Sequence, residues 1–253
     1  MKQPLMINKL LSSPKLKKAS ENTFWLFADR ILRYAVALFV GVWLARYLGE
    51  ERFGIFSYAI AYTSLFGILS RIGFRRVVVR ELVNRPKETN QILGSTFMMM
   101  LSLSLIFWCI TSFSVTLLNP GDQQTFFMVV IISFGFLFQP AEVVLYVFEA
   151  KEDLKYITII SSVVFIIISL FKVVLIVFQA ELIAFCWLIL LESLFTAIGY
   201  WVLYRRFKLS FRHWRFSRPL AKGILKESYP LVFAGLMVTI NAKIDQVMLR
   251  SMA

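Results

Sequence analysis

TNQILGSTFMMMLSLSLIFWCITSFSVTLLNPG, residues 89–121, is the longest stretch of this chain without a charged side chain. A helix needs about 20 predominantly apolar residues to cross the hydrocarbon core of a bilayer. This stretch exceeds that length, and it ends in Asn119-Pro120-Gly121, a combination that favours a turn. It therefore predicts a membrane-spanning helix at 92–118 followed by a tight connection.

The composition of the whole chain is also strongly apolar. Hydrophobic residues make up 58% of the 253 residues and charged residues 17%, with a mean hydropathy of +0.71. A typical soluble domain is about 45–50% apolar and about 25% charged, so a water-soluble fold of this length would lack polar surface. This excludes most soluble enzyme classes and predicts an all-α polytopic membrane protein.

Other charge-poor runs predict further spans on both sides of the first. The predicted spans are 23–45, 53–73, 92–118, 124–148, 157–178, 182–204 and 229–250. The first six would form one transmembrane bundle over 23–204, and the seventh would open a second bundle. A basic tail at 1–22 precedes the bundle, and a basic connection at 205–228 separates it from the seventh span.

Basic residues are distributed unequally between the two ends of these spans. The tail and the connections after spans two, four and six hold 21 Lys and Arg residues, against only Arg46 and Arg52 at the opposite end. Lys and Arg concentrate in cytoplasmic loops of membrane proteins. The chain is therefore expected to be a multi-pass membrane protein with its N-terminus in the cytoplasm.

Ionisable side chains inside the spans are the candidate functional residues, because a charge in hydrocarbon is costly. Span one carries Asp29, Arg30 and Arg33. Asp29 and Arg33 are four residues apart, so they share one helix face and can pair. Two interpretations stay open: a charged helix entrance whose arginines reach the lipid headgroups, or the wall of a hydrated cavity.

Span four carries a row of polar residues at spacings of three, four and three: Gln139, Glu142, Tyr146 and Glu149. Such spacing predicts one polar stripe on a helix, with Pro140 kinking that helix beside Glu142. Glu142 is expected to face a cavity, whereas Glu149 is expected to lie in solvent near the membrane surface.

Spans five to seven each carry one or two further candidates. Lys172 and Glu192 lie roughly 12 and 18 Å from the short turn between their helices at 1.5 Å per residue. They fit a structural ion pair, or an anion-binding lysine tuned by a carboxylate. In span seven, Asn241 and Asp245 share a face, which suits either a cavity or solvation at the outer end.

Enzymatic chemistry finds no support in the sequence. The chain has no phosphate-binding glycine loop, one histidine, His213, and two cysteines, Cys109 and Cys186, inside apolar runs. No catalytic residue, metal site or cofactor is predicted, and the chain is not expected to be an enzyme. The basic, aromatic segment 205–218 is interpreted as contacting lipid headgroups rather than nucleic acid.

Several segments, in this order and spacing, resemble one family of membrane transporters. They are Ala45–Gly54 (ARYLGEERFG), Val78–Leu82 (VVREL), Phe138–Val143 (FQPAEV) followed by Lys155-Tyr156, Leu170–Lys172 with Leu190–Glu192, and Lys243–Leu249 (KIDQVML). Together they are similar to the N-terminal half of polysaccharide-type flippases for lipid-linked oligosaccharides, such as O-antigen or capsule repeat units. These flippases belong to the multidrug/oligosaccharidyl-lipid/polysaccharide exporter superfamily.

The resemblance implies a function and a substrate. Members of the superfamily have two helix bundles that rock around a central cavity, an alternating-access scheme. The implied substrate is an undecaprenyl-pyrophosphate-linked oligosaccharide moved from the inner to the outer leaflet of a bacterial inner membrane for polysaccharide biosynthesis. Arg30, Arg33 and Lys172 would pair with the pyrophosphate or sugar, and a second group would line the cavity or bind a coupling proton or cation. That second group is Asp29, Glu142, Glu192, Asn241 and Asp245.

Two departures from the family pattern leave alternatives open. Leu145 stands where some relatives have an acidic residue, and the chain ends soon after the seventh span. A fragment or an interrupted reading frame is expected, with the second bundle missing from this chain, and a dimerising half-transporter is the alternative. The alternative functions are a drug or cation antiporter of the same superfamily and a truncated membrane protein without transport activity.

Overall fold

The computed structural model describes residues 14–71, 73–230 and 237 of the chain. This part is built of helices and contains no strand, and five of its helical segments are long and apolar enough to cross a membrane. The all-α polytopic fold predicted from the sequence is confirmed. Most of the predicted seventh span, including Asn241 and Asp245, lies outside the described residues.

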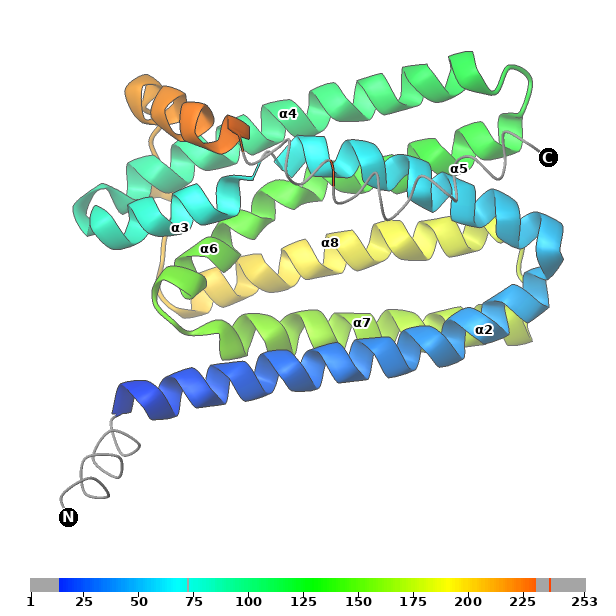
Figure 1. Cartoon of the computed structure of the whole chain (residues 1–253), viewed down its shortest axis with the longest axis horizontal. Helices are drawn as coiled ribbons and strands as arrows, with labels where there is room; N and C mark the ends of the chain where they lie inside the picture. The colour runs from blue at the N-terminus through cyan, green and yellow to red at the C-terminus, as the bar shows by residue number, and fades with distance from the viewer. Residues whose placement is uncertain (1–13, 72, 231–236, 238–253) are drawn as a thin grey trace.

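The first helical element doubles back on itself. Helix α2 (Pro14–Arg71) contains one residue with non-helical backbone, Gly49, at φ 72° and ψ 173°. Only glycine adopts this conformation readily, so the chain can reverse here without a loop. Figure 1 shows the first arm (14–48) beside α7 and the second arm (50–71) returning beside α4 and α5, elements that also contact α2.

The remaining elements follow in a compact series of antiparallel helices (Figure 1). They are α3 (Phe74–Asn84), η1 (Pro86–Glu88), α4 (Thr89–Leu118), α5 (Gln123–Phe134), η2 (Gly135–Ala141), α6 (Glu142–Ala150), α7 (Leu154–Val177), α8 (Leu182–Arg206) and η3 (Phe211–His213). Residues 218–230 are also helical. The turn before α5 is closed by Asp122, whose carboxylate accepts a hydrogen bond from the Thr125 backbone N–H at 3.0 Å.

The segment predicted as one helix at 124–148 is divided into three. The 3₁₀ helix η2 contains Pro140, which has no backbone N–H to donate and disrupts the regular helix pattern. The α-helical geometry resumes at Glu142, in the first turn of α6. The break separates Gln139, in η2, from Glu142 and Tyr146, in α6.

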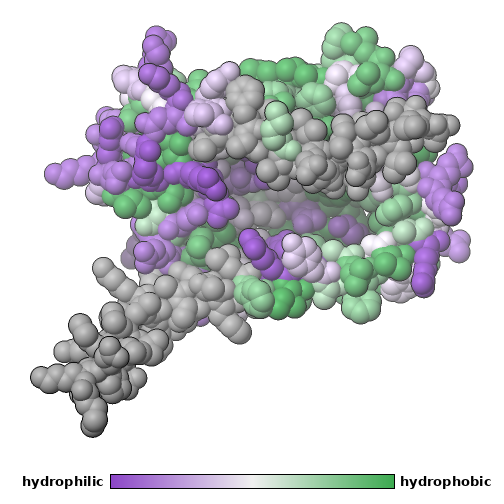
Figure 2. All heavy atoms as spheres, in the orientation of Figure 1, coloured by the Kyte–Doolittle hydropathy of each residue, from purple (hydrophilic) through white to green (hydrophobic). Residues whose placement is uncertain are grey.

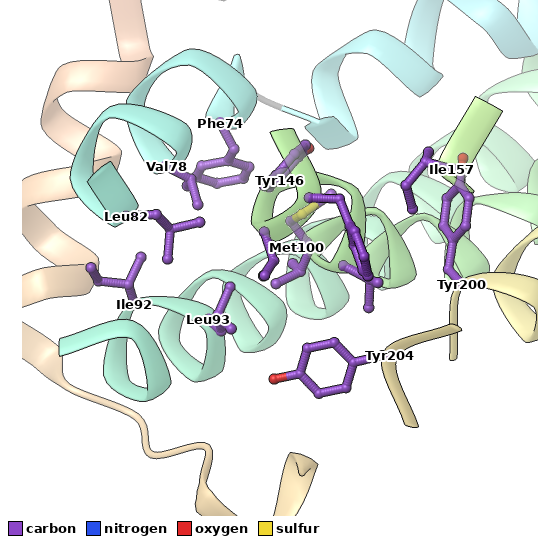
Figure 3. Packing of buried hydrophobic residues seen from close by; sticks show 14 of the residues in the cluster. Phe74, Val78, Leu82, Ile92, Leu93, Met100, Tyr146, Ile157, Tyr200 and Tyr204 are labelled. Atoms are coloured by element: carbon purple, nitrogen blue, oxygen red, sulfur yellow. The ribbon is translucent and has the colours of Figure 1, made fainter. Parts of the chain in front are cut away.

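Two buried apolar clusters hold the helices together. The first joins α3, α4, α6 and α8, and Figure 3 shows Phe74, Val78, Leu93, Met100 and Tyr146 converging within it. The second joins α2, α4, α5, α7 and α8, and includes fully buried Met128 and Phe185. Ile132 belongs to the second cluster and Tyr200 to the first. Both residues line one cavity, which lies between the two clusters.

On the face shown in Figure 2, hydrophilic side chains gather at the two ends of the helices and hydrophobic side chains cover much of the surface between them. Large apolar side chains such as Phe113 of α4 and Leu170 of α7 are more than 60% exposed, which suits contact with lipid rather than water. We call the end formed by segments 73–88, 151–153 and 207–217 the basic end. The opposite end carries Gly49 and the turns 119–122 and 179–181.

Candidate functional site

A cavity of about 550 Å³ lies inside the bundle, between both arms of α2 and the segments from α5 to α8. Small side chains that carry a hydroxyl group form part of its wall, on the same helices as the charged groups. The charged residues on this wall are Arg33, Arg71, Glu142 and Glu192. Among the residues predicted from the sequence, the structure thus brings Arg33, Glu142 and Glu192 to one cavity.

Asp29 positions Arg33 at the first arm of α2. The Arg33 Nε lies 3.0 Å from both carboxylate oxygens of Asp29, one helical turn away. The Ser162 hydroxyl of α7 donates a hydrogen bond to Asp29 Oδ1 at 2.5 Å. The Arg33 guanidinium also lies 4.8 Å from the centroid of the Phe165 ring, an arrangement that favours a cation. Two helices therefore hold this arginine at the cavity.

A second pair joins the end of α2 to the start of α6. Arg71 Nη2 lies 3.3 Å from Glu142 Oε1, and both residues line the cavity. Beside them, the Ser70 hydroxyl lies 2.5 Å from Gln139 Oε1. Glu142 stands in the first turn of α6, where the helix dipole favours a negative charge. The Glu142 carboxylate and the Gln139 amide therefore both lie at the end of the second arm of α2.

The third pair connects α7 and α8. Lys172 Nζ lies 3.8 Å from Glu192 Oε2, and their side chains are 19% and 29% exposed. Glu192 is part of the cavity wall, whereas Lys172 stands behind it and does not line the cavity. Lys172 is therefore placed to neutralise Glu192 rather than to contact the contents of the cavity in this conformation.

Two sequence predictions are corrected by the structure. The polar stripe on span four does not continue past Glu142, because Tyr146 is 2% exposed and packs in the first apolar cluster. Glu149 is not simply solvated: it accepts hydrogen bonds from Arg75 Nε at 2.8 Å and Nη2 at 3.1 Å. Arg30 has an exposed side chain and does not line the cavity.

Arg71 is the cavity residue that the sequence interpretation missed. It stands at the end of predicted span two, where it counts as one more positive charge on the cytoplasmic side. No local motif separates it from its neighbours Arg75 and Arg76, because its role depends on the distant Glu142. The hydroxyl groups of Ser64, Ser193 and Thr196 on the wall were likewise not singled out.

The cavity offers binding chemistry rather than bond-making chemistry. Paired cations and carboxylates, an amide and several hydroxyl groups can bind a charged, oxygen-rich ligand through charge-assisted hydrogen bonds. Within the described ranges there is no group of three or more His, Cys, Asp or Glu residues that could hold a metal ion.

The comparison with protein families agrees with this description. Residues 19–253, nearly the whole chain, match the family model described as "Polysaccharide biosynthesis protein". Comparisons with curated proteins and with solved structures found no match. The matched family consists of transporter-like membrane proteins rather than enzymes, and it includes the polysaccharide flippases that the sequence segments resemble. The chain therefore belongs to the polysaccharide biosynthesis protein family of multi-pass membrane proteins.

Proposed function

We propose that this protein moves an undecaprenyl-pyrophosphate-linked oligosaccharide from the inner to the outer leaflet of a bacterial inner membrane. Family membership supports a polysaccharide-related membrane flippase in general. The observation that carries the finer proposal is the cavity of about 550 Å³ with Arg33 and Arg71 on its wall. Arginines in a membrane interior are costly unless they serve a polar pathway.

The proposed ligand matches the wall chemically. A pyrophosphate presents several anionic oxygens, which guanidinium groups bind in a planar, bidentate manner. Sugar hydroxyl groups exchange hydrogen bonds with side chains such as Ser64, Gln139 and Thr196, all on the wall. The polyprenyl tail would remain in the bilayer while the polar head group occupies the cavity.

The ion pairs suggest how binding is coupled to protons. Arg33 and Arg71 already have carboxylate partners, Asp29 and Glu142, so an anionic ligand must compete with those carboxylates. Protonation of Glu142 would release Arg71 for the ligand, and release of both the ligand and the proton would restore the pair. We propose Asp29, Glu142 and Glu192 as the groups that bind the coupling proton or cation within the described residues. Asn241 and Asp245 remain proposed members of the same group.

Reconstitution of the full chain in liposomes tests this function. The liposomes would contain the lipid-linked oligosaccharide with a fluorescent nitrobenzoxadiazole group on its glycan, and dithionite added outside would reduce only the outer-leaflet label. The proposal predicts that active protein exposes the inner-leaflet label to dithionite in the presence of a proton gradient. Reduction of no more than the outer-leaflet share, with a gradient of either direction, would contradict it.

The same liposomes distinguish an antiporter of the superfamily. Accumulation of a fluorescent organic cation, driven by the proton gradient, would indicate drug or cation antiport. The cavity wall carries two arginines against two carboxylates, so it lacks the excess of negative charge that would attract an organic cation. We expect translocation of the lipid-linked oligosaccharide and no gradient-driven uptake of the cation.

A further inference from the structure

The connection after α8 presents a row of exposed side chains at the basic end. Along residues 211–218, half-buried residues alternate with exposed ones. The half-buried residues are Phe211, Trp214 and Ser217, and the exposed residues are Arg212, His213, Arg215, Phe216 and Arg218. We call residues 211–218 the basic strap.

The half-buried residues fix the basic strap to the helices. Trp214 Nε1 donates a hydrogen bond to the Tyr204 hydroxyl of α8 at 2.9 Å, and the Phe211 ring stacks on the Tyr204 ring with centroids 4.6 Å apart. The Ser217 backbone N–H donates to Ser95 Oγ of α4 at 2.9 Å. The exposed side chains therefore project from a backbone held at three points.

The strap also contacts α4 through backbone atoms. The Arg215 N–H donates to the Asn90 carbonyl oxygen at 3.3 Å. A Cβ on Gly94 would lie 2.7 Å from the Arg215 carbonyl oxygen and 2.8 Å from its nitrogen, closer than real Cβ contacts. Glycine at this position is therefore needed for the strap to lie against the helix.

The strap lies next to surface that faces lipid. Met98 of α4 is 52% exposed and is three residues from Ser95, which is roughly 5 Å along a helix. Phe216, on the strap itself, is 53% exposed. The exposed cations thus stand beside apolar side chains, where the surface of a bilayer would meet the helices.

The cations of the strap are available for an outside partner. Within the part of the chain that the structure describes, Arg212, Arg215 and Arg218 form no ion pair with a carboxylate. We propose that the basic strap is a binding surface for the headgroups of anionic phospholipids, with Phe216 inserted among the first acyl groups. A surface already ordered by its anchors loses little conformational freedom on binding. This proposal does not depend on what the cavity transports.

Lipid binding can be measured on the purified full chain in a neutral detergent. The concentration of dioleoylphosphatidylglycerol that gives half-maximal protection against thermal unfolding is compared with that of dioleoylphosphatidylcholine. We expect protection by the anionic lipid at much lower concentration. Replacing Arg212, Arg215 and Arg218 with Gln should raise its half-maximal concentration at least about tenfold, because each basic residue at an anionic surface contributes roughly a fivefold effect.

Two controls separate the strap from general positive charge. The triple variant of Lys87, Lys222 and Lys226 to Gln removes the same charge from exposed positions outside the strap, and it should raise the half-maximal concentration clearly less than the strap variant does. Gly94→Ala keeps every charge but displaces the strap, so it should weaken lipid protection, whereas Gly223→Ala, with no atom within 4 Å of its Cβ, should not.

Three results would overturn the proposal. Equal protection by the two lipids would show that the surface does not select anionic headgroups. An equal loss in the control triple variant would assign the effect to net charge. Equal protection by millimolar inorganic phosphate would identify a site for free phosphate instead of a lipid surface.

Discussion

Arg71, the last residue of α2, lies 3.3 Å from Glu142, in the first turn of α6, although 71 positions separate them in the chain. Their side chains are 53% and 25% exposed, and both border the cavity. Such a partly exposed pair contributes only about 0–1 kcal/mol to stability. A pair of this kind is therefore better suited to exchanging partners with a ligand than to holding helices together.

Replacement of Arg71 should separate transport from stability. We expect Arg71→Gln to lower the translocation rate at least about tenfold, the equivalent of one lost charge-assisted contact of about 1.5 kcal/mol or more. The thermal unfolding midpoint should change little because the pair is partly exposed. Arg76→Gln is the matched control: Arg76 is exposed, stands on α3 and does not line the cavity. Equal transport by both variants would remove Arg71 from the pathway.

The first arm of α2 offers a second comparison between neighbouring arginines. Arg33→Gln should reduce translocation, because Arg33 lines the cavity and is held by Asp29. Arg30, three residues earlier in the chain, has an exposed side chain. Arg30→Gln removes the same charge there, so its effect on translocation should be clearly smaller. Initial rates in liposomes containing matched amounts of each protein provide the measurement. A larger loss in the Arg30 variant would show that the cavity in this conformation is not the relevant one.

The Lys172–Glu192 pair is expected to behave as a structural unit. Lys172→Met leaves Glu192 without its partner between two helices, at a cost of about 1–3 kcal/mol, between the values for exposed and buried pairs. The double variant Lys172→Met/Glu192→Gln should recover most of that stability. Unfolding in a denaturing detergent gives the three free energies of a double-mutant cycle. Additive losses would mean that the two side chains do not interact.

Recovery of transport in that double variant would define the function of the pair. If both folding and translocation return, the pair only joins α7 and α8. If folding returns without translocation, Glu192 acts on the contents of the cavity, whose wall it forms.

The backbone conformation at Gly49 predicts that one added methyl group lowers the stability of the protein at this position and not at Gly41. Gly49→Ala places a side chain at φ 72° and ψ 173°, a region that costs about 1–3 kcal/mol for other residues. Gly41→Ala adds the same group within the helical first arm, where its Cβ meets no atom within 4 Å, and should be neutral or stabilising by about 0.5–1 kcal/mol. Thermal unfolding of the two variants measures the difference, and equal midpoints would mean that Gly49 is not the hinge of the reversal.

The sequence predicted those features that depend on local composition. An uncharged run at 89–121 was sufficient to locate the helix Thr89–Leu118, because the hydrocarbon core sets both its length and its polarity. The meeting of Lys172 with Glu192 followed from their depths on two helices joined by a short turn.

Features that depend on contacts between distant segments could not be predicted in the same way. Arg71 lies beside a basic segment that is typical of a cytoplasmic connection, and only the fold brings it next to Glu142. The stripe from Gln139 to Glu149 assumed a regular helix, whereas η2 rotates the positions before and after Pro140 relative to each other. Tyr146 lies after this break, in the same regular helix as Glu142, and it joins the apolar cluster because α3 and α4 pack against α6 there.

Substrate protection of a cysteine in the cavity tests the proposed pathway most directly. In a protein with Cys109 and Cys186 replaced by Ala, Ser64→Cys places a thiol on the wall, and Val163→Cys places one on the 48% exposed, lipid-facing side of α7. A membrane-impermeant maleimide should label the cavity thiol and not the lipid-facing one. Added undecaprenyl-pyrophosphate oligosaccharide should slow labelling of the cavity thiol severalfold, and an unchanged labelling rate at saturating lipid-linked oligosaccharide would contradict its entry into this cavity.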